Sequence, residues 1–248
     1  MYCCSRVKII LLFFILGIKF NLCQANIYVA FYATKNGNSG HIGIAIDNYD
    51  IKVNDLNIEG TIISKEDSVA NGTITYFDFW PAVAVIKIWQ IQNEYDPLYV
   101  QYPKSEFEEP YYLSDLYVKG IPKKKKRILD GLLEIRTSAK QDFELYSAIQ
   151  DVRSRNKKYN AVKYNCTDFV LDVLKSHFKL AIKLKKENIL FVGFHTPNRL
   201  FSYLLKNKNI NVLIDPKEKV KGSFFKERFL KRIFYKNSDF DEKMTTIT

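Results

Sequence analysis

The sequence predicts an α+β domain in which a small antiparallel sheet comes first and a helical half follows. Alternating segments rich in β-branched and aromatic residues occupy the first part of the chain: NIYVAFYAT (26–34), HIGIAID (41–47), GTITYFDFW (72–80) and AVAVIKIWQI (82–91). A long polar connection from about Tyr49 to Gly72 separates the second strand from the third, and Pro81 breaks the last two apart. Because the strands precede the helices instead of alternating with them, we expect the helices against one side of the sheet.

Two helices are expected directly after the sheet. Pro122 suits the first position of a helix that runs to about Ile135, and Ser138 with Gln141 forms a capping-box pattern that begins the next. The apolar stripe of the first is Ile128, Leu129, Leu132 and Leu133, and that of the second is Phe143, Tyr146, Ile149 and Val152.

Two further helices are expected nearer the C-terminus. One begins at Cys166 within YNCTDFVLDVL, and the other opens with Thr196 as its cap and Pro197 behind it. With 248 residues and a hydrophobic fraction of 47%, the chain is long and apolar enough to bury a core.

Residues 1–25 have the pattern of a secretory signal peptide. Arg6 and Lys8 precede an apolar run from Ile9 to Ile18, and a short stretch ending at Ala25 follows. A retained N-terminal anchor and lipid attachment at Cys23 are the alternatives, although the residues before Cys23 lack the small side chain usual at a lipidation site. We therefore expect an exported protein with a domain at 26–214 and a basic, amphipathic tail at 215–248.

The formal net charge is +11, which favours anionic partners. The basic residues cluster in KKKKR (123–127), KLKK (183–186) and the tail segment KEKVKGSFFKERFLKR (217–232). No helix-turn-helix, zinc or RNA-binding motif accompanies them, so nucleic acid is not an expected partner. The aromatic and basic tail instead suits an anionic membrane surface.

Cys166 is the only cysteine after the leader, so an internal disulfide is excluded once the leader is removed. Asn165 is a strong N-cap residue, and Asp168 is placed to reach back to it. A thiol in the first turn of a helix faces unpaired N–H groups, which are expected to lower its pKa and can bind an oxyanion. The alternative is that Cys166 is a small buried hydrophobe.

A catalytic thiol needs a base, and the sequence holds three histidines. His177 is excluded because eleven residues of helix place it roughly 16 Å from Cys166. His195 precedes the last helix and stays open as an alternative. His41 is favoured because Gly43 and Ala45 share its strand face, and small residues there allow the Cys166 helix to approach closely.

Asp78 is the candidate for the third group, which would orient the imidazole of His41. Antiparallel pairing places the end of the third strand beside the start of the second, with Tyr76 behind Asp78. Asp47 shares the face of His41 but is excluded, since six residues of strand separate them by roughly 20 Å. The alternative is that Asp78 faces solvent.

GHIGIAI, followed much later by YNCTDFVLDVL and HTPNRLFSYL, resembles the circularly permuted branch of the NlpC-type papain-like superfamily. That branch includes lecithin:retinol acyltransferase-like proteins and exported bacterial groups. The resemblance spans roughly residues 27 to 205 and implies a permuted papain-like fold. It implies Cys166 as the nucleophile, His41 as the base and Asp78 as the third polar group. The animal acyltransferases tend to carry a second histidine on the following strand, which this chain lacks.

These observations together lead us to expect an exported cysteine hydrolase that cleaves an amide or ester bond. By resemblance, peptide bonds of cell-wall stems are the expected substrates, and no cofactor or metal is expected. The alternatives are a lipid-directed acyltransferase or lipase that uses the same residues, and a secreted binding module without activity. Sequons at Asn71 and Asn165 would place a glycan on the candidate site in a eukaryotic secretory route, which favours a bacterial protein. The sequence does not indicate an oligomeric state.

Overall fold

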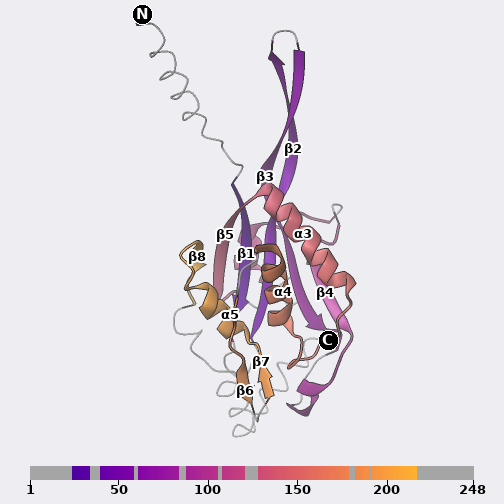
Figure 1. Ribbon diagram of the computed structural model, residues 1–248, viewed down its shortest axis with the longest axis vertical. Helices are drawn as coiled ribbons and strands as arrows, with labels where there is room; N and C mark the ends of the chain where they lie inside the picture. Colours follow the sequence, from indigo (N-terminus) through magenta and orange to yellow (C-terminus); the bar gives the residue numbers. More distant parts are fainter. Residues whose placement is uncertain are drawn as a thin grey trace, which may run out of the picture.

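The protein is an α+β domain built on one six-stranded antiparallel sheet (Figure 1). The computed structural model describes residues 24–33, 40–58, 61–83, 88–105, 108–120, 128–178, 182–189 and 192–216, with backbone alone for 24–25, 51–58, 61–67, 88–89, 177–178, 189 and 192. The order of the strands is β4-β3-β2-β1-β5-β8, and a separate small sheet pairs β6 with β7. The expected α+β class with an antiparallel sheet is confirmed.

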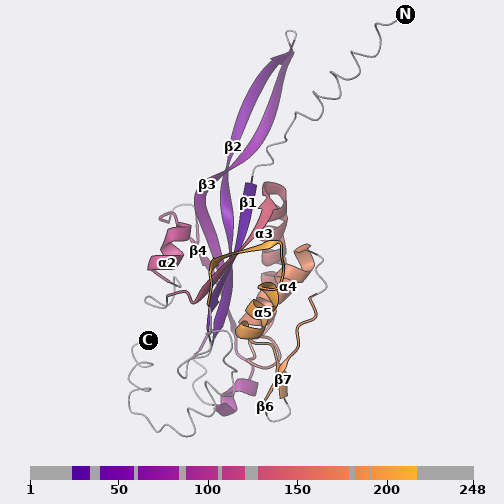
Figure 2. The ribbon, with the colours of Figure 1, turned by 90° about the vertical axis from the view of Figure 1, so that its left-hand side faces the viewer.

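The described helices are divided between the two faces of the sheet (Figure 2). The first face carries α3 (Ala139–Ser154), α4 (Cys166–Phe178) and α5 (Pro197–Leu204), and the second carries α2 (Leu113–Val118). Alternate residues of β1 (Gln24–Tyr32) enter the two cores, because successive side chains of a strand point to opposite faces. Both faces of the sheet centre are therefore buried.

The expected polar connection between the second and third strands is wrong, because the chain stays in strand conformation there. β2 (His41–Ile58) and β3 (Thr61–Pro81) form a hairpin whose pairing extends to Ile58 and Thr61, with one irregularity between Asp47 and Tyr49. The hairpin extends well beyond the other strands in both views (Figures 1 and 2). A paired hairpin can be formed by polar residues as well as by apolar ones, which is why composition alone predicted a connection.

The helix expected from Pro122 to Ile135 is also wrong in its described part. Residues Gly131–Ser138 form β5, which lies between β1 and β8 (Ile210–Ile214) and pairs Leu133 with Val29 of β1. Leu133 faces the core under the helices, and Leu132 faces the opposite one. A strand buried on both faces has a continuous apolar run, and such a run resembles a helical stripe.

The fourth expected strand, at 82–91, is replaced by other structure. Residues Ile88–Gln92 form a 3₁₀ helix, η1, and residues 84–87 lie outside the described residues. The edge strand next to β3 is instead β4 (Pro97–Tyr102), which pairs Val100 with Asp78 and Leu98 with Trp80. A strand at the edge tolerates its terminal Pro97, because the missing N–H faces away from the ladder.

The helix caps expected from the sequence are confirmed. Ser138 Oγ accepts the N–H of Gln141 at 3.3 Å, and Gln141 Oε1 accepts the N–H of Ser138 at 2.9 Å. Thr196 Oγ1 accepts the N–H of Arg199 at 3.3 Å, with Pro197 as the first helical residue. These bonds satisfy N–H groups that have no partner within the helix, and so fix where α3 and α5 begin.

The inward face of α3 differs from the expected one. Ile149 and Val152 are buried as expected, but Phe143 is 73% exposed and Tyr146 is 37% exposed. Leu145 and Asp142 are buried in their place. The helix is turned because Asp142 accepts hydrogen bonds from Thr137 and Tyr49, which places the next inward position at Leu145.

Several sequence predictions lie outside the described residues. These are the leader up to residue 23, Cys23 itself, the lysine run at 123–127 and the tail from residue 217. Within the described residues, no helix is long and apolar enough to cross a membrane.

Candidate functional site

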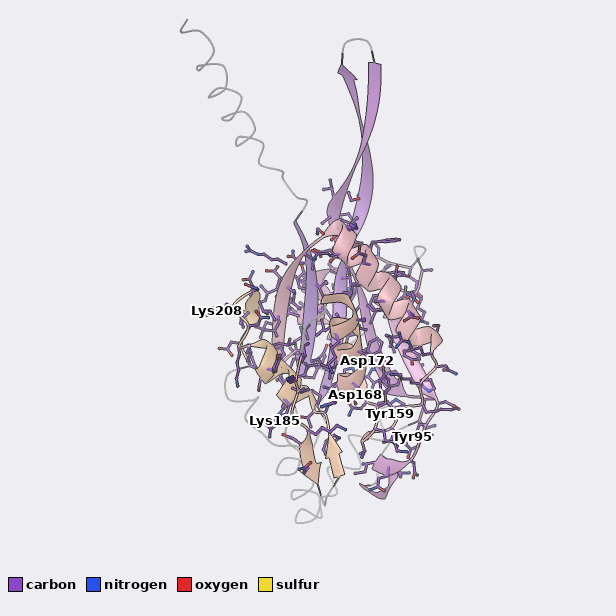
Figure 3. The ribbon with its side chains drawn as sticks, viewed as in Figure 1. Tyr95, Tyr159, Asp168, Asp172, Lys185 and Lys208 are labelled. Carbon is purple, nitrogen blue, oxygen red and sulfur yellow. The ribbon has the colours of Figure 1, made fainter. Side chains whose placement is uncertain are left out.

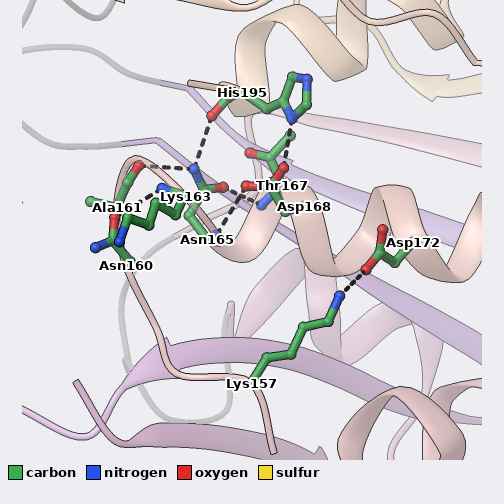
Figure 4. A network of polar contacts seen from close by, with 9 residues as sticks. All are labelled: Lys157, Asn160, Ala161, Lys163, Asn165, Thr167, Asp168, Asp172 and His195. Atoms are coloured by element: carbon green, nitrogen blue, oxygen red, sulfur yellow. Dashed lines mark hydrogen bonds and ion pairs between the residues drawn. The ribbon is translucent and has the colours of Figure 1, made fainter. Parts of the chain in front are cut away.

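The first turn of α4 carries the cap that the sequence predicts (Figure 4). Asn165 Oδ1 accepts the N–H of Thr167 at 2.8 Å, and Asp168 Oδ2 accepts the N–H of Asn165 at 3.0 Å. The amide of Asn165 also donates to the carbonyl of Ala161 at 3.0 Å. The position of Cys166 is therefore set by bonds on both sides of it, and Asn165, which is 6% exposed, is occupied as a cap rather than available as a glycan acceptor.

The thiol of Cys166 is buried, and this reverses the expected direction of its pKa. Burial is the largest of the causes that raise the pKa of Cys166 to about 12, and the negative charges of Asp168 and Asp78 contribute to this rise. The nearby backbone N–H of Ile42 lowers the pKa but does not offset the burial. The expectation of a lowered pKa is thus corrected: the group at rest is a neutral thiol, so a base must take its proton.

His41 and Asp78 are in contact and fully buried. Nε2 of His41 lies 3.2 Å from Oδ2 of Asp78, and the hydroxyl of Tyr76 donates to the same oxygen at 3.2 Å. Asp78 therefore does not face solvent. Since a carboxylate only accepts, this contact assigns the proton to Nε2 and leaves Nδ1 as the basic nitrogen of the ring.

Trp80 stacks on the imidazole of His41. The ring centroids are 3.8 Å apart and the planes are inclined by 19°. This contact was not predicted from the sequence, although the spacing allowed it: Trp80 follows Asp78 by two residues and so shares its strand face. The stacked indole fixes the plane of the imidazole and stabilises its protonated form.

We expected the Cys166 helix to pack on the strand face that carries Gly43 and Ala45, and this prediction is wrong. Ile42, Ile44 and Ile46 face α4 in the larger core, whereas Ala45 belongs to the opposite core with Tyr76. A Cβ added at Gly43 would lie 2.3 Å from the Tyr76 hydroxyl, so the glycine makes room for a tyrosine rather than for a helix.

The thiol reaches the start of β2 where this strand separates from β3. Pairing between the two strands ends at Ile44 and Phe77, although β2 begins three residues earlier and β3 continues to Pro81. In this opening the sulfur lies near the backbone N–H of Ile42, and the charge of Asp78 acts on it. Cys166 thus lies beside the residue that follows His41, approaching from the helix-covered face.

His195, the open alternative for the base, also lies at the start of α4. Its Nδ1 is 2.6 Å from Oδ1 of Asp168, and its carbonyl accepts the amide of Asn165 at 3.0 Å (Figure 4). The structure therefore brings Cys166, Asn165, His41, Asp78 and His195 to one end of the sheet. It does not bring Asp47 there, because Asp47 accepts the N–H of Asn26 further along β2.

Within the described residues, no group of three or more histidine, cysteine or acidic side chains could hold a metal ion. Comparisons with protein-family models, with curated proteins and with solved structures find no match for this chain. The function must therefore be argued from the site itself. A thiol at a helix start and a buried imidazole held by a carboxylate are the components of nucleophilic acyl chemistry.

Proposed function

We propose that the protein is an exported thiol hydrolase that cleaves an amide or ester bond with Cys166 as its nucleophile. The observation that supports it most is that the first turn of α4 brings Cys166 to the opening between β2 and β3, beside Ile42 and within reach of the charge of Asp78. The buried ring of His41, the residue before Ile42, is held by Asp78 at 3.2 Å. The fold would then be a permuted papain-like one, as the resemblance of GHIGIAI and NCTDFV implies.

In the proposed reaction, Nδ1 of His41 takes the proton of the Cys166 thiol as the sulfur attacks the carbonyl carbon of the substrate. The new C–S bond forms while the carbonyl π electrons move to oxygen, and the N–H of Cys166 stabilises this oxyanion. The C–N or C–O bond then breaks, and His41 returns its proton to the leaving group. Water, activated by the same imidazole, releases the acyl group as a carboxylic acid. Asp78 keeps the ring oriented throughout.

The substrate class follows from the resemblance rather than from the site geometry. Exported relatives of this kind suggest amide bonds in the stem peptides of the cell wall, so muropeptide digestion is the first assay. Acyl-enzyme formation is the more general test, since it needs no knowledge of the natural substrate. Incubation with p-nitrophenyl acetate should add one acetyl group to the Cys166 peptide, detected by mass spectrometry. The variant C166A should not be acetylated there, and neither should H41N within the same time.

Acetylation of wild type and H41N at equal rates would contradict the proposal, because it would show a thiol that reacts without its base. Unchanged turnover in C166A would leave only the binding-module alternative. His177 supplies a matched control: H177Q changes a histidine of the same helix that is too far from Cys166 to act on it, and it should retain acetylation.

A second candidate, acyl transfer or hydrolysis on membrane lipids by the same residues, is favoured by the charge next to the site. Lys183, Lys185 and Lys186 are exposed and precede β6 (Glu187–Ile189), which pairs with β7 (Val192–Phe194) directly before His195. Figure 3 shows Lys185 at the same end of the molecule as Asp168.

Vesicle flotation separates this candidate from the first. Binding to vesicles that contain phosphatidylglycerol, but not to neutral phosphatidylcholine vesicles, would support a lipid substrate if it is lost when the three lysines are replaced by serine. The same experiment with a variant that lacks residues 217–248 measures how much the tail contributes to vesicle binding. Absence of binding in the full chain would remove the reason for this candidate.

A further inference from the structure

A second histidine–carboxylate pair lies at the start of α4, separate from His41 and Asp78. Nδ1 of His195 and Oδ1 of Asp168 are 2.6 Å apart, and both side chains are largely buried, at 16% and 12% exposed. This distance is typical of a strong hydrogen bond to a charged group. The mechanism described above gives this pair no part.

The pair is tied to the helix start at two points. The second oxygen of Asp168 accepts the N–H of Asn165, the residue directly before Cys166, and the amide of Asn165 donates to the carbonyl of His195. The segment after β7 is thereby fixed to the first turn of α4. His195 can keep its bond to Asp168 in both protonation states, because a neutral imidazole still carries one N–H.

The charge of the pair, unlike its geometry, changes when His195 titrates. Asp168 lies two residues after Cys166, and its negative charge raises the pKa of the thiol. A protonated His195 balances that charge at close range, whereas a neutral His195 leaves it acting on the sulfur. The protonation of His195 should therefore be felt at Cys166.

We propose that His195 is a positioning residue for Cys166 which, when protonated, cancels the charge of Asp168 and so favours the thiolate. The proposal rests on the proposed function only for its use in catalysis, because thiol reactivity can be measured without any turnover. The charged and polar groups that face the sulfur are Asp168 and Thr167 from α4, Asp78 from β3 and the Ile42 N–H from β2. His41 lies beside them at the start of β2, and His195 faces Asp168.

The test is the alkylation rate of Cys166 by iodoacetamide as a function of pH, measured on the Cys166 peptide by mass spectrometry. At pH 5, Cys166 of wild type should be alkylated about three- to tenfold faster than Cys166 of H195Q. This ratio corresponds to a difference of up to one unit in the pKa of the thiol. The two rates should converge as the pH rises and His195 loses its proton. A purely structural role would shift the H195Q rate by the same factor at every pH.

The variant D168N tests the same proposal by removing the negative charge that His195 is proposed to cancel. It remains informative if H195Q folds poorly. Asparagine can still accept the N–H of Asn165, so the cap is kept while the charge is removed. D168N should be alkylated faster than wild type above pH 8, and H195Q should have no further effect in the D168N background. A slower D168N, or equal effects of H195Q with and without Asp168, would overturn the proposal.

H177Q serves as the matched control and should follow the wild-type curve at every pH. The outcome is also separable from that of the proposed function. Equal acetylation of Cys166 in wild type and H41N would refute the hydrolase while leaving the alkylation profiles interpretable. Conversely, an active enzyme with parallel wild-type and H195Q profiles would retain the hydrolase and remove this role of His195.

Discussion

His41 and Asp78 bridge the opening between β2 and β3 with their side chains, Nε2 lying 3.2 Å from Oδ2, where the backbones of the two strands no longer pair. Both residues are buried, at 1% and 0% exposed, so this contact is protected from water. An ion pair or charged hydrogen bond in such surroundings is sensitive to the loss of either partner, because the other is left buried and unpaired. Replacement of either residue is therefore a sensitive test of the site.

Replacing Asp78 by asparagine should separate thiol reactivity from catalysis. The neutral amide of the D78N variant cannot hold His41 with its proton on Nε2 as a carboxylate does, so kcat should fall by about 10²–10⁴-fold. Asp78 also raises the pKa of Cys166 by its charge, so D78N should be alkylated faster than wild type. Steady-state turnover of a p-nitrophenyl ester and iodoacetamide labelling measure the two effects.

Opposite signs of these two effects are what the proposed roles require. D142N is the control, since Asp142 is equally buried but bonds to Thr137 and Tyr49, away from the site. A D78N variant that loses turnover and labelling together would indicate a general loss of structure instead of a catalytic role.

Gly43→Ala should destabilise the protein, because the added Cβ would lie 2.3 Å from the hydroxyl and 2.6 Å from Cζ of Tyr76. Both neighbours belong to a rigid, buried ring, so the tyrosine must move, and overpacking of this kind costs about 1–3 kcal/mol of unfolding free energy. Displacing Tyr76 also withdraws its hydrogen bond from Asp78, so turnover should fall as well. Urea denaturation and ester hydrolysis are the measurements.

Gly72→Asn provides the comparison for this substitution. Gly72 has φ +82 and no atom within 4 Å of an added Cβ, and asparagine is among the residues that tolerate positive φ best. Its effect on stability should be smaller than that of G43A, and turnover should be unchanged. If G43A is as stable as wild type, the close packing of Tyr76 on β2 is refuted.

The residues of the site were predicted from the sequence more accurately than the face of β2 on which α4 packs. Asn165, Cys166 and Asp168 form a local capping pattern within four residues, and local hydrogen bonds can be inferred from spacing alone. Asp78 was placed beside His41 from strand order, and this contact is present. The helix-packing face was wrong because glycine and alanine indicate close approach without saying whether a helix or a side chain approaches.

The errors in the fold have a common physical origin. β5 was taken for a helix because Leu132, Leu133 and Ile135 are all buried, which removes the two-residue alternation that marks a half-exposed strand. The long hairpin was taken for a connection because the residues between Tyr49 and Gly72 are largely polar, although their backbones pair as far as Ile58 and Thr61. In both places tertiary surroundings, rather than local propensity, decide the structure.

The turned face of α3 predicts unequal effects for two apolar residues of this helix. Leu145 is fully buried, so L145A should lower the unfolding free energy by about 2–5 kcal/mol. Phe143 is 73% exposed, so F143A should change it by no more than about 0.5 kcal/mol. Urea denaturation of the two variants gives the comparison, and a larger loss in F143A would restore the face expected from the sequence.

The pH dependence of stability should depend in part on two buried carboxyl groups at the base of the hairpin. Burial raises the pKa of Asp142 to about 6, although hydrogen bonds from Thr137 and Tyr49 oppose this, and burial likewise raises the pKa of Asp47 to about 6. Both groups bind protons more tightly folded than unfolded, where the pKa is 3.8. Their contribution to stability is therefore fully present below pH 3.8 and is lost as the pH rises through about 6.

Replacing Asp142 by asparagine should remove its share of this dependence, because asparagine does not ionise and can still bond to the two hydroxyl groups. The difference in melting temperature between wild type and D142N should favour D142N more at pH 8 than at pH 4.5. E144Q, on the same helix but at an exposed position, should give a difference that does not vary over this range. A D142N variant whose stability relative to wild type is constant with pH would mean that Asp142 titrates at its ordinary value despite its burial.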